Sequence, residues 1–185
     1  MTRDEIDVAA LHAGIKQVAI VDLDFAATDG LRVVDGAPWR IEADLRGLPV
    51  WYADAVREPA VRFVSRAEIP APGSSLTMAR EAALLSYPYC CVIAFHRRRR
   101  LFHLLNARAI ARQADGDRES MMRLARADIV LAPRGAREQR WLRLATWTSF
   151  AAGTSIAMCP DCDARDDSAA RRVAQRYCAL AGLAT

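Results

Sequence analysis

Lysine is nearly absent from this sequence. Of the 26 basic residues, Lys16 is the single lysine and the other 25 are arginines, and three histidines accompany them. An arginine excess is typical of proteins encoded by GC-rich genomes. It also suits the recognition of phosphate or carboxylate, because the guanidinium group binds both with paired hydrogen bonds. The formal net charge is +4.

Long apolar runs are missing as well. A membrane-spanning helix needs ~20 apolar residues in succession, and the longest candidate, residues 147–158, is interrupted by polar residues and a glycine. The N-terminus lacks the basic and then apolar layout of a secretory signal. We therefore expect a cytoplasmic protein with no membrane partner. The hydrophobic fraction of 52% is still sufficient for a folded core.

The motifs of common catalytic sites are also lacking. The sequence contains no glycine-rich loop that would hold a phosphate and no Gly-x-Ser-x-Gly turn that would present a nucleophile. His103 alternates with apolar residues, which favours a core histidine over a ligand. We therefore assign no catalytic residue and favour a protein that binds over one that catalyses.

The apolar pattern predicts an α+β fold. Runs rich in β-branched and aromatic residues predict strands at residues 17–24, 31–34, 39–41, 48–52, 61–65 and 128–132, with a hairpin turn at Asp35–Gly36. Helical spacing predicts helices at residues 4–15, 75–86, 106–113, 118–126, 136–150 and 168–180. The short connections favour a mostly antiparallel sheet covered by helices. We expect residues 1–135 to form this sheet domain and residues 136–185 a helical C-terminal subdomain packed on it.

The stretch from Tyr87 to Leu105 is predicted to form two central strands. Two apolar runs of strand length flank a block of positive charge, so the simplest interpretation is a hairpin with the block at its turn. Buried unpaired arginine is costly, and the side chains of this turn are therefore expected in solvent. The expected partner-binding residues are His96, Arg97, Arg98, Arg99 and Arg100.

Cysteine is present five times, and the lack of a secretory signal argues against a disulfide framework. Cys159-Pro-Asp-Cys162 has the CxxC spacing of many zinc sites. A tetrahedral site needs two further ligands, and Cys178 is available as one. A redox dithiol and ordinary reduced cysteines are the alternatives. Cys90 and Cys91 are interpreted as buried apolar residues that point to opposite faces of a strand.

Two carboxylates end the first predicted strand. Asp22 and Asp24 are two residues apart, which on a strand places them on the same side, where both can bind one Mg²⁺ ion. Such a pair is found in metal-dependent enzymes that act on phosphorylated or nucleotide substrates. A solvated strand end is the simpler interpretation.

Three functional hypotheses arise from these features. The first is a non-catalytic binding or accessory protein that engages an acidic protein, peptide or nucleic acid through the arginine-rich turn and a sheet edge. The second is a divalent-metal-dependent enzyme that uses Asp22 and Asp24. The third is a subunit of a larger complex or homo-oligomer, in which the apolar residues 147–158 and the C-terminal helices bury against another chain.

Overall fold

A computed structural model describes residues 2–26, 30–34, 47–56, 61–69, 78–127, 135–146, 149–150, 154, 156–180 and 182. The chain divides into two compact units. The first unit comprises residues 1–39, 59–95 and 148–185, and the second comprises residues 40–58 and 96–147. These units are defined by which residues lie close together in space. The expected division into residues 1–135 and 136–185 is defined instead by the change from strands to helices along the sequence, and it stays a prediction.

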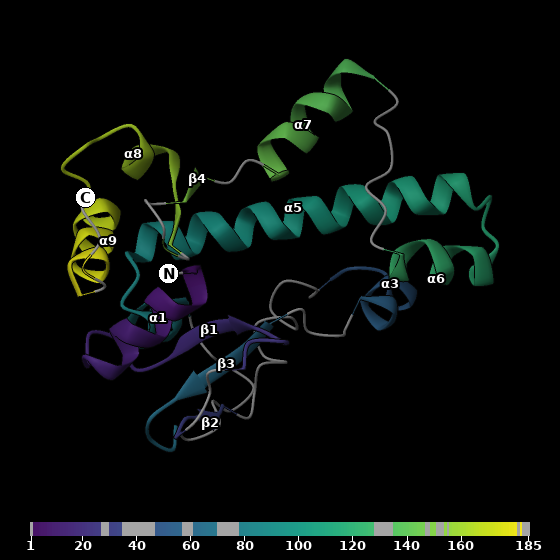
Figure 1. Cartoon of the computed structure of the whole chain (residues 1–185). Helices are drawn as coiled ribbons and strands as arrows, with labels where there is room; N and C mark the ends of the chain where they lie inside the picture. Colours follow the sequence, from purple (N-terminus) through teal and green to yellow (C-terminus); the bar gives the residue numbers. More distant parts are fainter. Residues whose placement is uncertain are drawn as a thin grey trace. The chain divides into compact units, whose positions relative to one another are not determined.

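A three-stranded antiparallel sheet lies in the first unit (Figure 1). Its strands are β1 (Ala19–Asp22), β2 (Arg32–Val33) and β3 (Val61–Ser65), in the order β1-β3-β2. Ala19 pairs with Val64 and Arg32 with Ser65. Together with the helices, this antiparallel sheet confirms the predicted α+β class.

Both faces of this sheet are buried. Val21 and Val64 point to one face and pack with Val8 and Leu11 of helix α1 (Arg3–His12). Phe63 points to the opposite face and belongs to the main core of the unit. Helix α1 begins with a capping box, in which Thr2 and the N3 glutamate each accept a hydrogen bond from the other's backbone N–H. The helix that covers β1 is thus fixed at its first turn.

Where the structure describes it, the rest of the first unit is helical apart from one short strand pair. It contains α4 (Met78–Leu85), the start of α5 (Tyr89–Gln113), α8 (Pro160–Asp163) and α9 (Ala169–Leu180), with β4 (Ser149–Phe150) paired to β5 (Ala157–Met158). Helix α9 packs against α1. Tyr177 of α9 is fully buried and donates a hydrogen bond to the carbonyl of Leu85 at 3.0 Å. The predicted C-terminal helical segment is therefore present as α8 and α9.

The second unit is built from helices in its described part. Besides α5 from residue 96 onward, it contains α3 (Val50–Ala55), α6 (Arg118–Arg126) and α7 (Ala136–Thr146). Helix α3 packs on α6. The buried side chains of this core are Leu48, Tyr52, Ala55, Ala107, Ile110, Met121 and Ala125.

The prediction of two strands between Tyr87 and Leu105 is wrong. This stretch lies in α5, a single helix of 25 residues. The buried positions of α5 recur at spacings of three, four and seven, as a helix requires. They are Cys91, Val92, His96, His103, Asn106, Ala107 and Ile110. Two of them are histidines, so the helical period does not appear when apolar residues alone are considered. The helix begins after Pro88, whose carbonyl accepts hydrogen bonds from the amides of Cys91 and Val92.

Other differences are smaller. Residues 48–52 are predicted as a strand, but Val50–Ala55 forms α3, with Pro49 immediately before it in the position where a missing N–H costs nothing. The predicted helix at 136–150 ends at Thr146, and its last residues form β4. The predictions at 39–41, Asp35–Gly36 and 128–132 lie outside the described residues. Among the described helices, none has the length and apolar character needed to cross a membrane.

Candidate metal centre

Four cysteines from two distant parts of the sequence meet in the first unit. The Sγ atoms of Cys90, Cys91, Cys159 and Cys162 all lie within 4.8 Å of one another. Cys91, Cys159 and Cys162 are buried, whereas Cys90 is exposed. The cluster therefore sits at the edge of the main core, with one thiol at the surface.

The CxxC segment is positioned by α8 and the strand before it. Cys159 comes directly after β5 and occupies the N-cap position of α8, Pro160 takes the first helical position, and Cys162 lies one turn later. Proline at that position fixes the backbone angle that the helix needs without losing a hydrogen bond. The amide of Asp163 donates to the carbonyl of Cys159 at 2.9 Å, which closes the turn. The two thiols thus come to one side of a single helical turn.

The other two thiols come from the first turn of α5. Cys90 and Cys91 are adjacent, and on a helix adjacent side chains diverge by about 100° rather than 180°. Both Sγ atoms can therefore reach the same point, which the predicted strand would not allow. The interpretation of this pair as apolar strand residues on opposite faces is wrong, and Cys90 is not buried.

The spacing of the sulfur atoms suits one tetrahedral ion. Zinc bound by four thiolates at about 2.3 Å places neighbouring sulfurs about 3.8 Å apart. The Sγ atom of Cys90 lies 3.8 Å from that of Cys162 and 4.0 Å from that of Cys91. These separations are far longer than the roughly 2.05 Å of a disulfide bond. The four sulfurs are thus arranged as ligands of a common centre and not as two cystines.

The thiols strongly perturb one another. Cys90 is exposed as a residue, but its thiol is partly removed from solvent, and this burial raises the pKa of Cys90 to about 11. Hydrogen bonds with Cys162 and Cys159 add to the increase. Burial also raises the pKa of Cys91. For Cys162 the backbone N–H of Ala170 and the three neighbouring thiols outweigh burial, so that its pKa is lowered. Without a cation, Cys162 therefore loses its proton more readily than Cys90 and Cys91 do.

Backbone amides also face the sulfurs. The N–H of Cys159 donates to the Sγ atom of Cys91 at 3.4 Å. The N–H of Ala170 acts in the same way on Cys162. Such donors stabilise negative charge on sulfur. The site thus supplies part of the charge compensation that a centre of four thiolates requires.

The structure brings together two of the three cysteines that the sequence predicts as zinc ligands. Cys159 and Cys162 are in the cluster, but Cys178, which is buried in α9, is not among the four. Cys90 and Cys91 complete the set in its place. His103, which is interpreted from the sequence as a core histidine, is buried and lies 3.1 Å through its Nδ1 from the hydroxyl of Tyr52.

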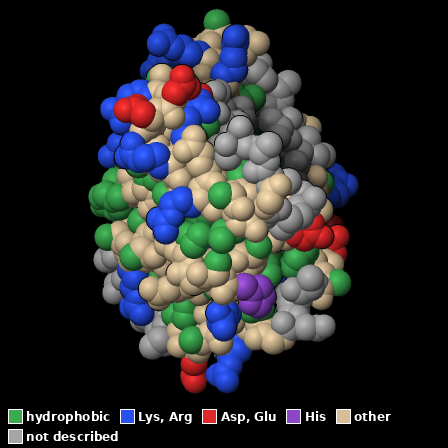
Figure 2. Space-filling view, turned by 60° about the vertical axis from the view of Figure 1, so that its left-hand side comes forward, with side chains coloured by type: hydrophobic (Ala, Val, Ile, Leu, Met, Phe, Trp, Pro, Cys, Tyr) green, Lys and Arg blue, Asp and Glu red, His purple; other side chains and the backbone are tan. Residues whose placement is uncertain are grey.

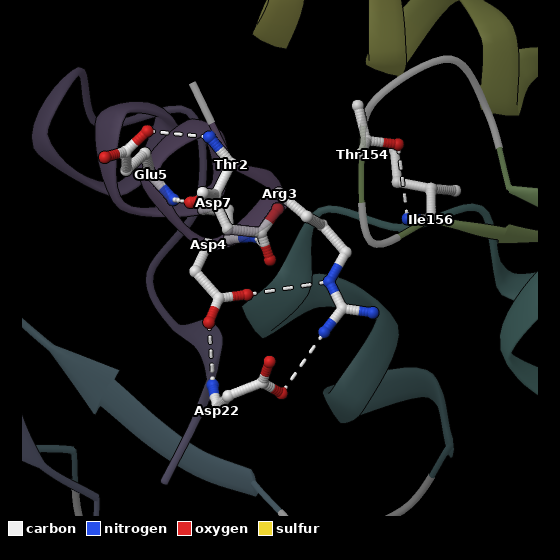
Figure 3. A network of polar contacts seen from close by, with 9 residues as sticks. Thr2, Arg3, Asp4, Glu5, Asp7, Asp22, Thr154 and Ile156 are labelled. Carbon is white, nitrogen blue, oxygen red and sulfur yellow. Dashed lines mark hydrogen bonds and ion pairs between the residues drawn. The ribbon is translucent and has the colours of Figure 1, made fainter. Parts of the chain in front are cut away.

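Asp22 and Asp24 lie at the end of the first strand, β1, and in the turn that follows it, respectively. Asp22 accepts from Arg3 at 3.3 Å, and its backbone N–H donates to Asp4 at 2.8 Å (Figure 3). Among the described residues, one group of three or more His, Cys, Asp or Glu side chains is placed so that it could hold a metal ion, and it is the group of four cysteines. The magnesium hypothesis stays a prediction without structural support.

The arginine block is not a hairpin tip. Arg97, Arg99 and Arg100 are exposed on α5, Arg98 is half-buried and His96 is buried. Because successive helical residues are about 100° apart, these four guanidinium groups leave the helix in different directions. These arginines therefore do not form one cationic tip, and any positively charged surface that includes them extends over more than one helix.

Comparisons with protein-family models, with curated proteins and with solved structures found no significant match to this chain. A function for this protein is therefore inferred from the chemistry of its own residues.

Proposed function

We propose that this protein is a non-catalytic binding protein whose first unit holds one structural zinc ion. The observation that carries the proposal is the convergence of four Sγ atoms, from Cys90, Cys91, Cys159 and Cys162, within 4.8 Å. Tetrahedral sites of four thiolates are typical of zinc that stabilises a fold.

The ligand count favours a structural role over a catalytic one. Catalytic zinc keeps one coordination position for water or substrate, whereas four cysteines fill a tetrahedron. The ion would join the start of α5 to the segment formed by β5 and α8. Cys91 and Cys159, one from each part, are 68 residues apart in the sequence. Because the four ligands come together only in the folded chain, the free energy of zinc binding would stabilise the fold.

Zinc fits this site better than the other candidates. An iron–sulfur cluster would place several atoms between the sulfurs, and separations of 3.8 and 4.0 Å match a single ion instead. A redox dithiol needs two cysteines, and it gives no reason for the other two to converge on the same point. Magnesium prefers oxygen ligands and is excluded by an all-sulfur set.

Metal analysis of purified protein and its cysteine variants tests this proposal. Wild-type protein should contain one zinc per chain. Cys90→Ser and Cys162→Ser should each lower the zinc content several-fold. Each should also lower the melting temperature by about 10 °C, because zinc at a thousandfold excess over its dissociation constant stabilises the wild-type fold by about 4 kcal/mol.

The matched control is Cys178→Ala. Cys178 is a buried cysteine of the same unit outside the cluster, so its replacement perturbs the core without removing a ligand. This variant should keep its zinc. Wild-type protein that takes up no zinc from a zinc-containing solution, or a Cys178→Ala variant that loses as much as Cys90→Ser, would overturn the proposal.

The binding role is assigned to the second unit. In sequence, this unit contains 16 arginines and 9 acidic residues, a net charge of +7. Figure 2 draws one face of the whole chain, on which basic side chains (blue) are visible at several places. Exposed arginines are present on three helices of the unit, namely Arg97, Arg99, Arg100, Arg108 and Arg112 on α5, Arg118, Arg123 and Arg126 on α6, and Arg137, Arg140 and Arg143 on α7. An acidic partner, either a nucleic acid or an acidic protein or peptide, fits this charge.

A further inference from the structure

One face of helix α7 combines arginine with exposed apolar side chains. Arg137, Arg140, Trp141 and Leu144 are all exposed, the last two by 43% and 50%. At 3.6 residues per turn these four positions fall within an arc of about 100°. They therefore form one continuous surface along the helix, which we call the α7 face.

A neighbouring side of α7 is turned towards the second unit. Ala145 is buried and Leu142 is half-buried. Glu138 lies on that side and pairs with Arg112 of α5 at 2.9 Å. The α7 face lies next to these contacts around the helix, and its side chains, Trp141 among them, are exposed to solvent.

We propose that the α7 face binds single-stranded nucleic acid. The indole of Trp141 offers a flat apolar surface on which an unpaired base can stack, and Leu144 extends that surface. Arg137 and Arg140 lie one turn apart beside the indole, where their guanidinium groups can pair with successive phosphates. Stacking requires a base that is not already paired, so the ligand is single-stranded and not a duplex.

The charge of the unit favours a polyanion over an acidic peptide. With a net charge of +7 and arginines exposed on three helices, the second unit attracts an extended chain of phosphates beyond the two groups that the α7 face contacts. An acidic peptide would use the arginines but gives no reason for a tryptophan beside them. The inference rests on the partner binding proposed for the second unit, and it is independent of the zinc ion.

Binding of a labelled oligouridine of about 15 nucleotides to the zinc-loaded full chain tests this inference by fluorescence anisotropy. Trp141→Ala should weaken binding about tenfold or more, whereas Trp141→Phe, which keeps a ring, should lose much less. Arg137→Ser combined with Arg140→Ser should lower the slope of log K against log salt by about 1.4, as expected for two lost phosphate contacts on a single strand.

Helix α9 offers a matched control. Arg176 and Leu180 are exposed one turn apart on this helix of the first unit, and the double variant Arg176→Ser, Leu180→Ala should bind as wild type does. Trp141→Ala with unchanged affinity, or equal affinity for a duplex of the same length, overturns the inference. Binding of polyglutamate without binding of oligouridine overturns it too, but it leaves an acidic partner as the function. Binding of neither probe removes both.

Discussion

Lys16, the single lysine of the chain, is buried in the core of the first unit. Its Nζ atom lies 2.8 Å from a carboxylate oxygen of Asp7, and both side chains are fully inaccessible to solvent. The same atom lies 5.3 Å from the ring centre of Tyr87 and 5.1 Å from that of Tyr177. Burial lowers the pKa of Lys16, and the charge of Asp7 opposes this shift. Each charge of the pair thus compensates the other in a site that solvent does not reach.

Breaking this pair should cost far more than replacing it. Lys16→Met or Asp7→Leu alone leaves one buried charge without its partner and should lower the free energy of unfolding by about 3–5 kcal/mol. The double variant should lose much less than the sum of the two. Urea unfolding of the zinc-loaded proteins measures all three values. Additive losses in the double variant would show that the two charges do not compensate each other.

At the scale of single residues, the sequence revealed one half of the metal centre. Cys159 and Cys162 are close in sequence, and their CxxC spacing is a local pattern. Cys90 and Cys91 have no such pattern, and their partnership depends on a fold that brings together residues 68 positions apart. One local feature does point to these two ligands. Two adjacent cysteines follow Tyr-Pro-Tyr directly, where the proline can begin a helix that places both thiols near one point.

At the scale of elements, α5 shows why apolar pattern alone can mislead. Its first turns contain Val92, Ile93 and aromatic residues, which favour strands locally. The helix is stabilised by a buried stripe that includes His96 and His103, and polar members of a stripe are not seen by a hydrophobic pattern. By contrast, the sequence predicts β1 and β3 because both strands are rich in β-branched or aromatic residues, namely Ile20, Val21, Val61, Phe63 and Val64.

The helical state of the arginine block can be tested with proline. The side chain of Arg97 is exposed, and the residue lies well inside the length of α5. Proline at such a position removes a backbone hydrogen bond and clashes with the preceding turn of the helix. Arg97→Pro should lower the free energy of unfolding by about 3 kcal/mol or more, whereas Arg97→Ala should change it by about 0.5 kcal/mol or less. Equal stability of the two variants in chemical denaturation would mean that residue 97 lies in a turn.

Helix α6 makes stability depend on pH through its cap. Asp117 is the N-cap and accepts a hydrogen bond from the amide of Ser120 at 2.9 Å. Its pKa lies below the ordinary 3.8 because the side chain and the backbone of Ser120 both stabilise the carboxylate. Since the folded pKa is the lower one, the carboxylate stabilises the fold above pH 3.8, and this contribution is lost as the pH falls through the folded pKa.

Asp117→Asn separates this titration from the cap itself, because asparagine caps a helix equally well but carries no charge. Wild-type protein should lose stability relative to Asp117→Asn as the pH falls from about 5 to about 3, a range that spans about one unit on either side of the ordinary pKa. Unfolding curves collected across this range provide the comparison. Parallel pH profiles for the two proteins would contradict the assignment of the cap charge.

At the scale of the whole molecule, the four clustered cysteines and the positive charge belong to different units. All five cysteines lie in the first unit, which contains 13 acidic and 10 basic residues and has a net charge of −3. The second unit has a net charge of +7. A zinc ion would therefore stabilise the unit that is not proposed to bind the partner. Stability and recognition can then be altered separately by substitution.

Zinc removal should loosen the first unit selectively. Chelation should speed amide hydrogen exchange in the first turn of α5, in β5 and in α8, because these segments are held by the ion. Amides of α6 should keep their protection, since its buried contacts through Met121 and Ala125 lie in the second unit. Mass-spectrometric exchange measurements with and without chelator resolve these segments. Equal acceleration in both units would contradict a local role for the metal.

The most direct test of the metal centre is X-ray absorption at the zinc edge of the purified full chain. We predict a single shell of four sulfur atoms at about 2.3 Å, with no nitrogen or oxygen neighbour. The spectrum should be unchanged in Cys178→Ala. A shell that contains nitrogen or oxygen, or fewer than four sulfurs, would contradict a centre formed by Cys90, Cys91, Cys159 and Cys162.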